Sequence, residues 1–178
     1  GQALDSFNTA IATASNKVYV VYETFTTSRE RHVFLVRSTD NGATWSAPLQ
    51  VDHGTGTDFV AATPRVAAIG NNVYVTWRDN RNGSLDVFVN RSTNSGAAFA
   101  ASDTRLDVGT IAGSSSSFNP VIGAEGTNVY VAWVDDRMAG SFDIWVNHSS
   151  DSGATWVTSS ATRLDQDTFG HDSIDPQI

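Results

Sequence analysis

Two copies of a Trp-x-Asp-x-Arg motif carry the residues best suited to bind a charged ligand, and they span Trp77–Arg81 and Trp133–Arg137. A guanidinium near a carboxylate can hold loops together by charge-assisted hydrogen bonds, or it can present its planar fork to a substrate carboxylate. A motif that recurs in the successive repeats of a chain usually serves the structure of the repeat. The interpretation that these residues hold loops together is therefore favoured, and binding of a substrate carboxylate stays open. The ligand-binding candidates are Arg65, Arg78, Asp79, Arg81, Asp135, Asp136 and Arg137.

Catalytic residues are harder to find. Acid–base hydrolysis needs a positioned pair of titratable groups, or a nucleophile activated by a base. No such pair can be named in this sequence, and all four tyrosines fall within segments expected to form strands. No catalytic residue is therefore assigned, and an enzyme is not the favoured interpretation.

The densest acidic stretch comprises Asp165, Asp167, Asp172 and Asp175. Carboxylate oxygens suit calcium, which is a hard cation, but these residues do not match an EF-hand loop. A solvated connection between strands is the favoured interpretation. We therefore expect no cofactor, with calcium as the weaker alternative. The four histidines show no paired spacing of the kind that binds zinc.

Composition narrows the range of partners. The chain has 178 residues, 40% of them hydrophobic and 17% charged, with a formal net charge of −8 and no cysteine. A globular fold without disulfides follows. The net negative charge disfavours binding to nucleic acid and to anionic membranes, because proteins bind both through clustered positive charge. No apolar run is long enough to span a membrane, so membrane insertion is not expected.

An octapeptide is repeated along the chain and defines its organisation. Ser38–Trp45 returns as Ser149–Trp156, with a weaker copy at Ser92–Phe99. The glycines of these copies are 54 and 57 residues apart, and the Val-Tyr-Val segments that begin at 18, 73 and 129 are 55 and 56 residues apart. A period near 50 residues is typical of propeller blades rather than of helical solenoids.

The Ser-x-Asp-x-Gly-x-Thr-Trp pattern resembles the Asp-box, or bacterial neuraminidase repeat, of sialidase-like β-propellers. Within that family the box lies away from the active face, so the resemblance implies a structural role. An aspartate can accept hydrogen bonds from the N–H groups of its own loop, and the glycine can supply a positive φ. The residues expected to build the three boxes are Ser38, Asp40, Gly42, Thr44, Trp45, Ser92, Asn94, Gly96, Phe99, Ser149, Asp151, Gly153, Thr155 and Trp156.

Each repeat contains four short apolar segments separated by turns, which predicts an all-β fold of four-stranded antiparallel blades. We expect one propeller segment over residues 1–178, with blades at 7–62, 63–117 and 118–174 and with 175–178 opening a further blade. Packing of blade on blade should bury the row of Tyr19, Tyr74 and Tyr130. Three blades fall below the usual range of about four to eight. Either two chains complete one propeller or the chain is part of a longer polypeptide, and the second alternative is favoured.

The loops between second and third strands should share one face with the connections between blades, and the boxes should lie on the opposite face. The resemblance implies a set of three arginines from different blades. Arg65, Arg78 and Arg137 are conceivable members of such a set, but their spacing alone does not select them. The resemblance is weaker for the residues that carry the family's catalysis. The nearest segments to the family's Arg-Ile-Pro motif are Thr63–Val66, in which the order is changed, and Asn119–Ile122, which has no arginine. The family's tyrosine nucleophile and its glutamate partner have no credible counterparts here.

The leading hypothesis is a non-catalytic Asp-box propeller module, extracellular or at the cell surface, that recognises a glycan or a protein. One alternative is an exo-sialidase-like glycoside hydrolase whose catalytic residues are completed by blades outside this chain. A second alternative is a self-assembling repeat protein whose unmatched edge strand pairs with another chain.

Overall fold

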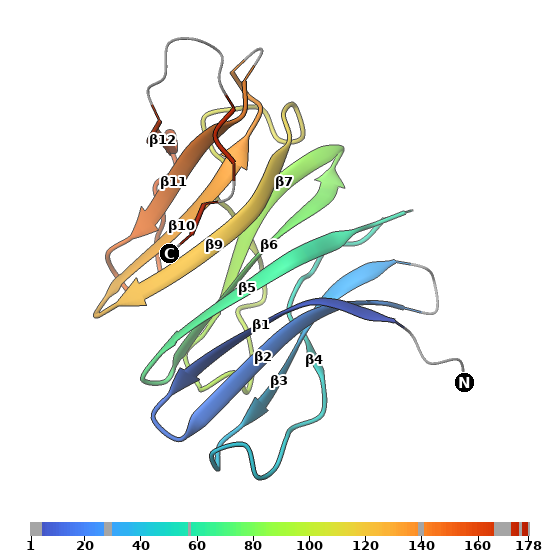
Figure 1. The fold of residues 1–178 in the computed structure, drawn as a ribbon, viewed down its shortest axis with the longest axis vertical. Coiled ribbons are helices and arrows are strands. Elements are labelled where there is room, and N and C mark those ends of the chain that lie inside the picture. The colour runs from blue at the N-terminus through green and yellow to red at the C-terminus, as the bar shows by residue number, and fades with distance from the viewer. Residues whose placement is uncertain are drawn as a thin grey trace.

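The computed structural model describes residues 5–26, 30–56, 58–138, 141–165, 172–174 and 176–177. These residues form an all-β fold of three four-stranded antiparallel sheets, each with its strands in chain order. The sheets fan out as the blades of a partial β-propeller, with the first strand of each blade innermost (Figure 1). Within the described ranges, no helix is long and apolar enough to cross a membrane.

The strand bounds follow the repeat. The first blade contains β1 (Ser6–Ala14), β2 (Lys17–Phe25), β3 (Arg31–Ser38) and β4 (Leu49–Gln50). The second contains β5 (Ala61–Ile69), β6 (Asn72–Asn82), β7 (Ser84–Ser92) and β8 (Thr104–Arg105). The third contains β9 (Ser117–Glu125), β10 (Asn128–Asp135), β11 (Asp143–Ser149) and β12 (Thr162–Arg163).

Strand register places the loops on two faces. In the first blade Val18 pairs with Ser38, so the octapeptide loop lies where β2 begins, and Phe25 pairs with Arg31 at the other end. The connection between the first two blades reaches that second end, because Arg31 forms a bridge with Val60. The octapeptide loops therefore lie opposite the face that carries the β2–β3 turn and the interblade connection.

Two hydrophobic clusters fill the space between blades. Tyr19 and Trp77 belong to the cluster between the first and second blades, and Tyr74 and Trp133 belong to the one between the second and third. All four side chains are fully buried. The expectation that Tyr130 would be buried in the same way is wrong, because 43% of this residue is exposed. The side of its blade that faces away from the second blade carries no further blade among the described residues.

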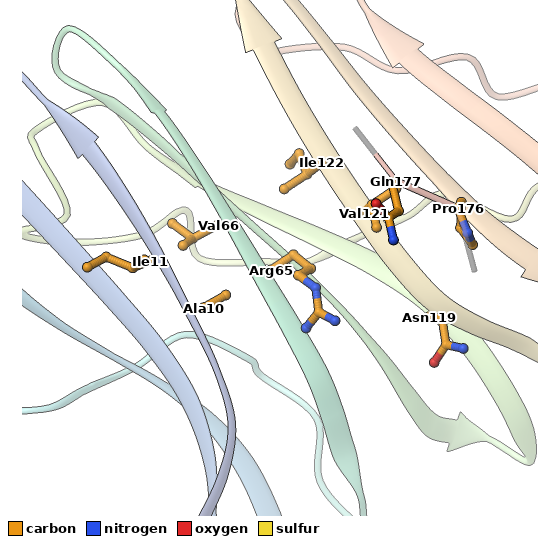
Figure 2. A pocket seen from close by; sticks show the side chains of 9 residues that line it. All are labelled: Ala10, Ile11, Arg65, Val66, Asn119, Val121, Ile122, Pro176 and Gln177. Atoms are coloured by element: carbon orange, nitrogen blue, oxygen red, sulfur yellow. The ribbon is translucent and has the colours of Figure 1, made fainter.

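The strand expected at 175–178 is only partly within the described residues, since 175 and 178 lie outside them. Pro176 and Gln177 are described and belong to no strand. They line the same cleft as β9 (Figure 2).

Candidate ligand-binding cleft

The innermost strands share a bulge at the same place. Asn8, Thr63 and Asn119 have left-handed backbones, with φ of 47°, 52° and 46°. Pairing with the second strand shifts at or beside each of these residues. A bulge re-aims the side chains around it, and such bulges are common beside binding sites.

A cleft of about 530 Å³ opens between these innermost strands. Arg65 is the one charged side chain in the part of the lining that the structure describes, and in Figure 2 its guanidinium projects from β5 on the side where Asn119 lies on β9. Among the described residues, the Pro64 carbonyl is the one hydrogen-bond acceptor of this guanidinium, at 2.9 Å. The cleft is lined by Ala10, Ile11, Arg65, Val66, Asn119, Val121, Ile122, Pro176 and Gln177.

A second hollow, of about 230 Å³, adjoins the cleft, because Asn119 lines both. Its charged residue is Arg78, whose guanidinium carbon lies 5.6 Å from the centre of the Phe118 ring. Burial lowers the pKa of Arg78, although nearby Glu23 opposes that effect. Among the residues described, nothing accepts a hydrogen bond from its buried Nε. Phe142 and Ile174 complete an apolar wall beside this cation.

A buried carboxylate organises the neighbouring end of the first blade. Glu23 has no exposed surface. It accepts hydrogen bonds from Asn8 Nδ2 at 3.0 Å, Arg31 Nη1 at 3.1 Å and the backbone N–H of Thr63 at 2.6 Å. Because Thr63 belongs to the second blade, this carboxylate ties two blades together close to Arg78 and the cleft.

The two Trp-x-Asp-x-Arg motifs have one geometry. Trp77 Nε1 donates to Asp79 at 2.8 Å, and Arg81 Nη2 donates to the same carboxylate at 2.6 Å. Trp133 and Arg137 make the equivalent bonds to Asp135, at 3.1 Å and 2.5 Å. Both aspartates are fully buried.

Each of these arginines makes further contacts, Arg81 within its own blade and Arg137 with the preceding interblade connection. Arg81 forms an ion pair with Asp103 at 2.8 Å and stacks 4.0 Å from the Phe88 ring. Arg137 donates to the Val108 carbonyl at 2.9 Å and lies 4.1 Å from the Trp145 ring. These contacts favour the loop-holding interpretation, while ligand binding by Asp79, Arg81, Asp135 and Arg137 stays a prediction.

The remaining candidate, Asp136, is exposed and accepts a 2.6 Å hydrogen bond from the N–H of Ser116. It lines neither the cleft nor the adjoining hollow. The structure therefore brings Arg65 and Arg78 to adjoining cavities and places the other candidates outside their linings.

The octapeptide loops are closed by their own side chains. In the first loop, Asp40 accepts bonds from Ser38 Oγ at 2.7 Å, the Thr44 N–H at 2.9 Å and Thr44 Oγ1 at 2.5 Å. These hydrogen bonds lower the pKa of Asp40 to about 2. Gly42 has a φ of 89°, a conformation that favours glycine.

The other two loops repeat this arrangement. Asp151 makes the same bonds with Ser149 and Thr155, which lower its pKa strongly. Asn94 accepts the bonds from Ser92 Oγ and the Ala98 N–H, and the hydroxyl contact is absent because position 98 is alanine. Phe99 and Trp156 pack against the interblade clusters. Trp45, expected to lie against its own blade, is 47% exposed.

Two aspartates of the acidic stretch predicted as a weak calcium candidate, Asp167 and Asp175, lie outside the described residues. Asp165 accepts a bond from the Ile144 N–H at 2.9 Å, and Asp172 accepts one from the Phe142 N–H at 3.1 Å. Across the described part of the chain, no group of three or more His, Cys, Asp or Glu side chains could hold a metal ion.

Sequence reasoning did not assign a role to the bulges or to the Glu23 network. A signal for two of the bulges was present, since Ser6-Phe7-Asn8 matches Ser117-Phe118-Asn119. Thr63 carries no such signal. The hydrogen bonds of Glu23 join residues far apart in the chain, which a local pattern cannot reveal.

No protein-family model matches the chain, and no curated protein matches it either. Several solved structures do match the chain. Zg3597, a family 117 glycoside hydrolase produced by the marine bacterium Zobellia galactanivorans, matches with a TM-score of 0.61 and 10% identity over 91% of this chain and 56% of that chain.

Two further matches are complexes with sugars. The α-L-arabinanase of Penicillium chrysogenum complexed with arabinobiose has a TM-score of 0.56 and 15% identity over 83% of this chain and 45% of its own. The Trypanosoma rangeli sialidase in complex with sialic acid has a TM-score of 0.54 and 18% identity over 88% of this chain and 28% of its own. At such identities the likeness shows a shared sialidase-like propeller fold, of which this chain spans between about a quarter and somewhat over half.

Proposed function

We propose that this protein is a non-catalytic glycan-binding module whose ligand occupies the cleft between the innermost strands. The observation that carries the proposal is the Arg65 guanidinium, which lies in a cleft of about 530 Å³ with one intramolecular acceptor among the described residues. An extracellular or cell-surface location, where complex glycans are displayed, belongs to the same proposal.

The lining favours an acidic sugar. A guanidinium binds a carboxylate through two parallel hydrogen bonds, and this geometry is specific as well as strong. Arg78 adds a second cation in the adjoining hollow, beside the rings of Phe118 and Phe142. The side chains of Val66 and Ile122 offer apolar surface for the C–H groups of a sugar ring. The net charge of −8 does not oppose this, because a local cation acts at short range.

The absence of acid groups in the lining supports a binding role without hydrolysis. Within the described residues, neither cavity is lined by an aspartate, a glutamate or a tyrosine. The nearest carboxylate named above, Glu23, is fully buried and saturated by Asn8, Arg31 and Thr63. The described residues that line these cavities therefore do not supply two carboxyl groups on either side of a glycosidic bond.

Calorimetric titration with sialic acid and with arabinobiose tests the proposal. We expect sialic acid to bind and arabinobiose to bind more weakly or not at all. Arg65→Met should weaken sialic acid binding roughly ten-fold or more, and Arg65→Lys should fall between, because lysine keeps the charge but loses the fork. Lys17→Gln, a change at the octapeptide end of β2, is the matched control. If neither sugar binds, the proposed ligand class is wrong.

A glycoside hydrolase completed by blades outside this chain is the second candidate. The comparisons support it, because the three proteins described above are named for glycoside hydrolysis and this chain covers 56%, 45% and 28% of them. Release of a fluorophore from its sialoside or arabinofuranoside by the intact gene product, abolished by Arg65→Met, would establish this candidate and reject the non-catalytic one.

A further inference from the structure

The octapeptide loop of one blade packs on the preceding blade at both interfaces between the described blades. A Cβ at Gly96 would lie 3.4 Å from Tyr19 Cε1 and 3.4 Å from Leu35 Cδ2, so the second loop rests on these two side chains. A Cβ at Gly153 would lie 2.9 Å from Tyr74 Cε1, so the third loop rests on the equivalent tyrosine. The two interfaces are built alike and can be compared residue by residue.

An arginine of the preceding blade holds the loop at each interface. Arg37 Nη1 donates to the Ser95 carbonyl at 2.9 Å, and Arg91 Nη1 donates to the Ser152 carbonyl at 3.0 Å. Because the same bond occurs at both interfaces, these arginines serve the attachment of the loop. They do not account for any feature that distinguishes one interface from the other.

A cavity of about 190 Å³ lies at the interface between the second and third blades. Its lining comes from β7, from the segment 100–104 and from the third octapeptide loop. None of its lining residues lines the proposed glycan cleft or the adjoining hollow. The cavity is therefore a separate candidate site, enclosed by parts of two blades that the chain itself supplies.

Strand register identifies the residues that open this cavity. Leu35 pairs with Leu49 between β3 and β4, and Val89 pairs with Thr104 at the same place between β7 and β8. Valine and threonine thus stand where the first interface has two leucines, and both line the cavity. Valine also lacks the Cδ atom with which Leu35 meets the loop at Gly96. The loss of side-chain volume accounts for the space.

The same comparison shows that the lining has become more polar. Trp156 ends the third octapeptide where Phe99 ends the second, so an indole N–H is added. Among the described residues, nothing accepts a hydrogen bond from Trp156 Nε1, and the hydroxyls of Ser102 and Thr104 have no partner. Asn90 fixes the wall between them, because its Nδ2 donates to the carbonyl of the segment 100–104 at 3.0 Å. The cavity thus offers one donor and two hydroxyls that the fold leaves unused.

These groups suit a ring that carries hydroxyl groups. An indole offers an apolar surface for C–H groups and an N–H at its edge, while serine and threonine hydroxyls both donate and accept. The volume is below the roughly 300–1,000 Å³ of pockets for drug-sized ligands, which favours a single ring. The residues that distinguish this interface from the first are uncharged, since Arg91 has its counterpart in Arg37.

We propose that this cavity binds one neutral sugar residue and is a second glycan site, on the side of the octapeptide loops. It shares no residue with the cleft around Arg65, so either site can exist without the other. The two sites would let one molecule hold two parts of a glycan, an acidic unit in the cleft and a neutral unit between the blades.

Nuclear magnetic resonance of the indole N–H groups tests the proposal. The chain has five tryptophans, so five indole signals can be followed during titration with the methyl glycosides of glucose, galactose and arabinofuranose. The signal of Trp156 is identified by its loss in Trp156→Phe, a residue that the second octapeptide already carries as Phe99. We expect one of these glycosides to move the Trp156 signal saturably, with a dissociation constant on the order of 1–10 mM.

A variant that copies the first interface provides the decisive comparison. Val89→Leu combined with Thr104→Leu should fill the cavity and weaken binding roughly ten-fold or more. Trp45→Phe is the matched control, because Trp45 ends the first octapeptide and lies outside the cavity. The proposal is overturned if none of the three glycosides moves the Trp156 signal, or if the double leucine variant binds as tightly as wild type.

Two further results would assign the ligand differently. Loss of the shift in Arg65→Met would mean that the sugar occupies the central cleft, which would overturn a second site and leave the first. Movement of the Trp156 signal by inorganic sulfate alone would mean that Arg91 binds anions there, and the neutral ligand class would be wrong. A shift that survives Arg65→Met and fails in the double leucine variant supports the proposal.

Discussion

The backbone N–H of Thr63 donates a 2.6 Å hydrogen bond to Glu23 Oε2, so a buried carboxylate of one blade holds the innermost strand of the next. Asn8 and Arg31 donate to the other carboxylate oxygen. Glu23→Gln keeps the shape of the side chain and removes its charge. We expect a loss of about 1–3 kcal/mol in the free energy of unfolding, measured by urea denaturation. Glu125→Gln, at an exposed strand end, should change it little, and equal effects of the two substitutions would contradict this role for Glu23.

We expect Arg81 to be structural and Arg65 to serve the proposed ligand, and unfolding experiments can separate these two roles. Arg81→Met would leave the buried carboxylates of Asp79 and Asp103 without their guanidinium, so we expect a loss of about 3–5 kcal/mol in stability. Arg65→Met removes one bond to a neighbouring carbonyl and should cost less than about 1 kcal/mol. Thermal and urea unfolding of both variants provide the comparison. A loss on Arg65→Met as large as that on Arg81→Met would mean that Arg65 is structural.

The octapeptide glycines allow a matched pair of substitutions. Gly153 and Gly42 both have a positive φ, of 74° and 89°, so alanine strains either backbone by about 1–2 kcal/mol. At Gly153 the added Cβ also meets Tyr74 at 2.9 Å, whereas at Gly42 it meets nothing closer than 3.9 Å. Gly153→Ala should therefore be the more destabilising by about 1–3 kcal/mol in urea unfolding. Equal losses of unfolding free energy in the two variants would show that the Tyr74 ring moves aside at little cost.

Stability should depend on pH through Asp107. Burial, and then the carboxylate of Asp86, raise the pKa of Asp107 to about 7, although Arg105 opposes them. Arg105 Nε approaches Asp107 Oδ1 to 2.7 Å as an ion pair without hydrogen-bond geometry. Between the ordinary value of 3.8 and about 7 the folded state binds more protons than the unfolded one, so stability should fall as pH rises through this window.

Asp107→Asn isolates this effect from the titration of other groups, including His32, whose pKa is also raised. The variant mimics the protonated carboxyl. We expect it to be about 1–3 kcal/mol more stable than wild type at pH 7, with little difference near pH 4. Urea denaturation at both pH values gives the two differences. A constant difference across the window would show that Asp107 does not titrate there.

The architecture could be predicted because its signals are local and repeated. The octapeptide loops are closed by hydrogen bonds within four residues, such as those between Asp40 and Thr44, so their residue types report the turn directly. The alternation in each Val-Tyr-Val segment likewise reports a strand. Burial of Tyr130 could not be predicted, because it depends on a neighbouring blade rather than on its own segment.

The candidate site was predicted only in part. Arg65 and Arg78 were named because arginine can bind a carboxylate, but the same reasoning named Arg81 and Arg137, whose side chains the structure engages in ion pairs and ring contacts. What separates the two pairs is which aspartates and carbonyls lie within reach in three dimensions. The spacing of residues along the chain does not contain that information.

The bulged residue of each innermost strand is followed, two positions later, by a residue that lines the cleft, and these residues are Ala10, Arg65 and Val121. A small, a cationic and a branched side chain thus occupy equivalent places on nearly the same backbone. Each repeat can exchange its contribution to the cavity without disturbing the turns and cross-strand pairs that support it. The chemical character of the cleft can therefore change one blade at a time, while the backbone that supports it stays the same.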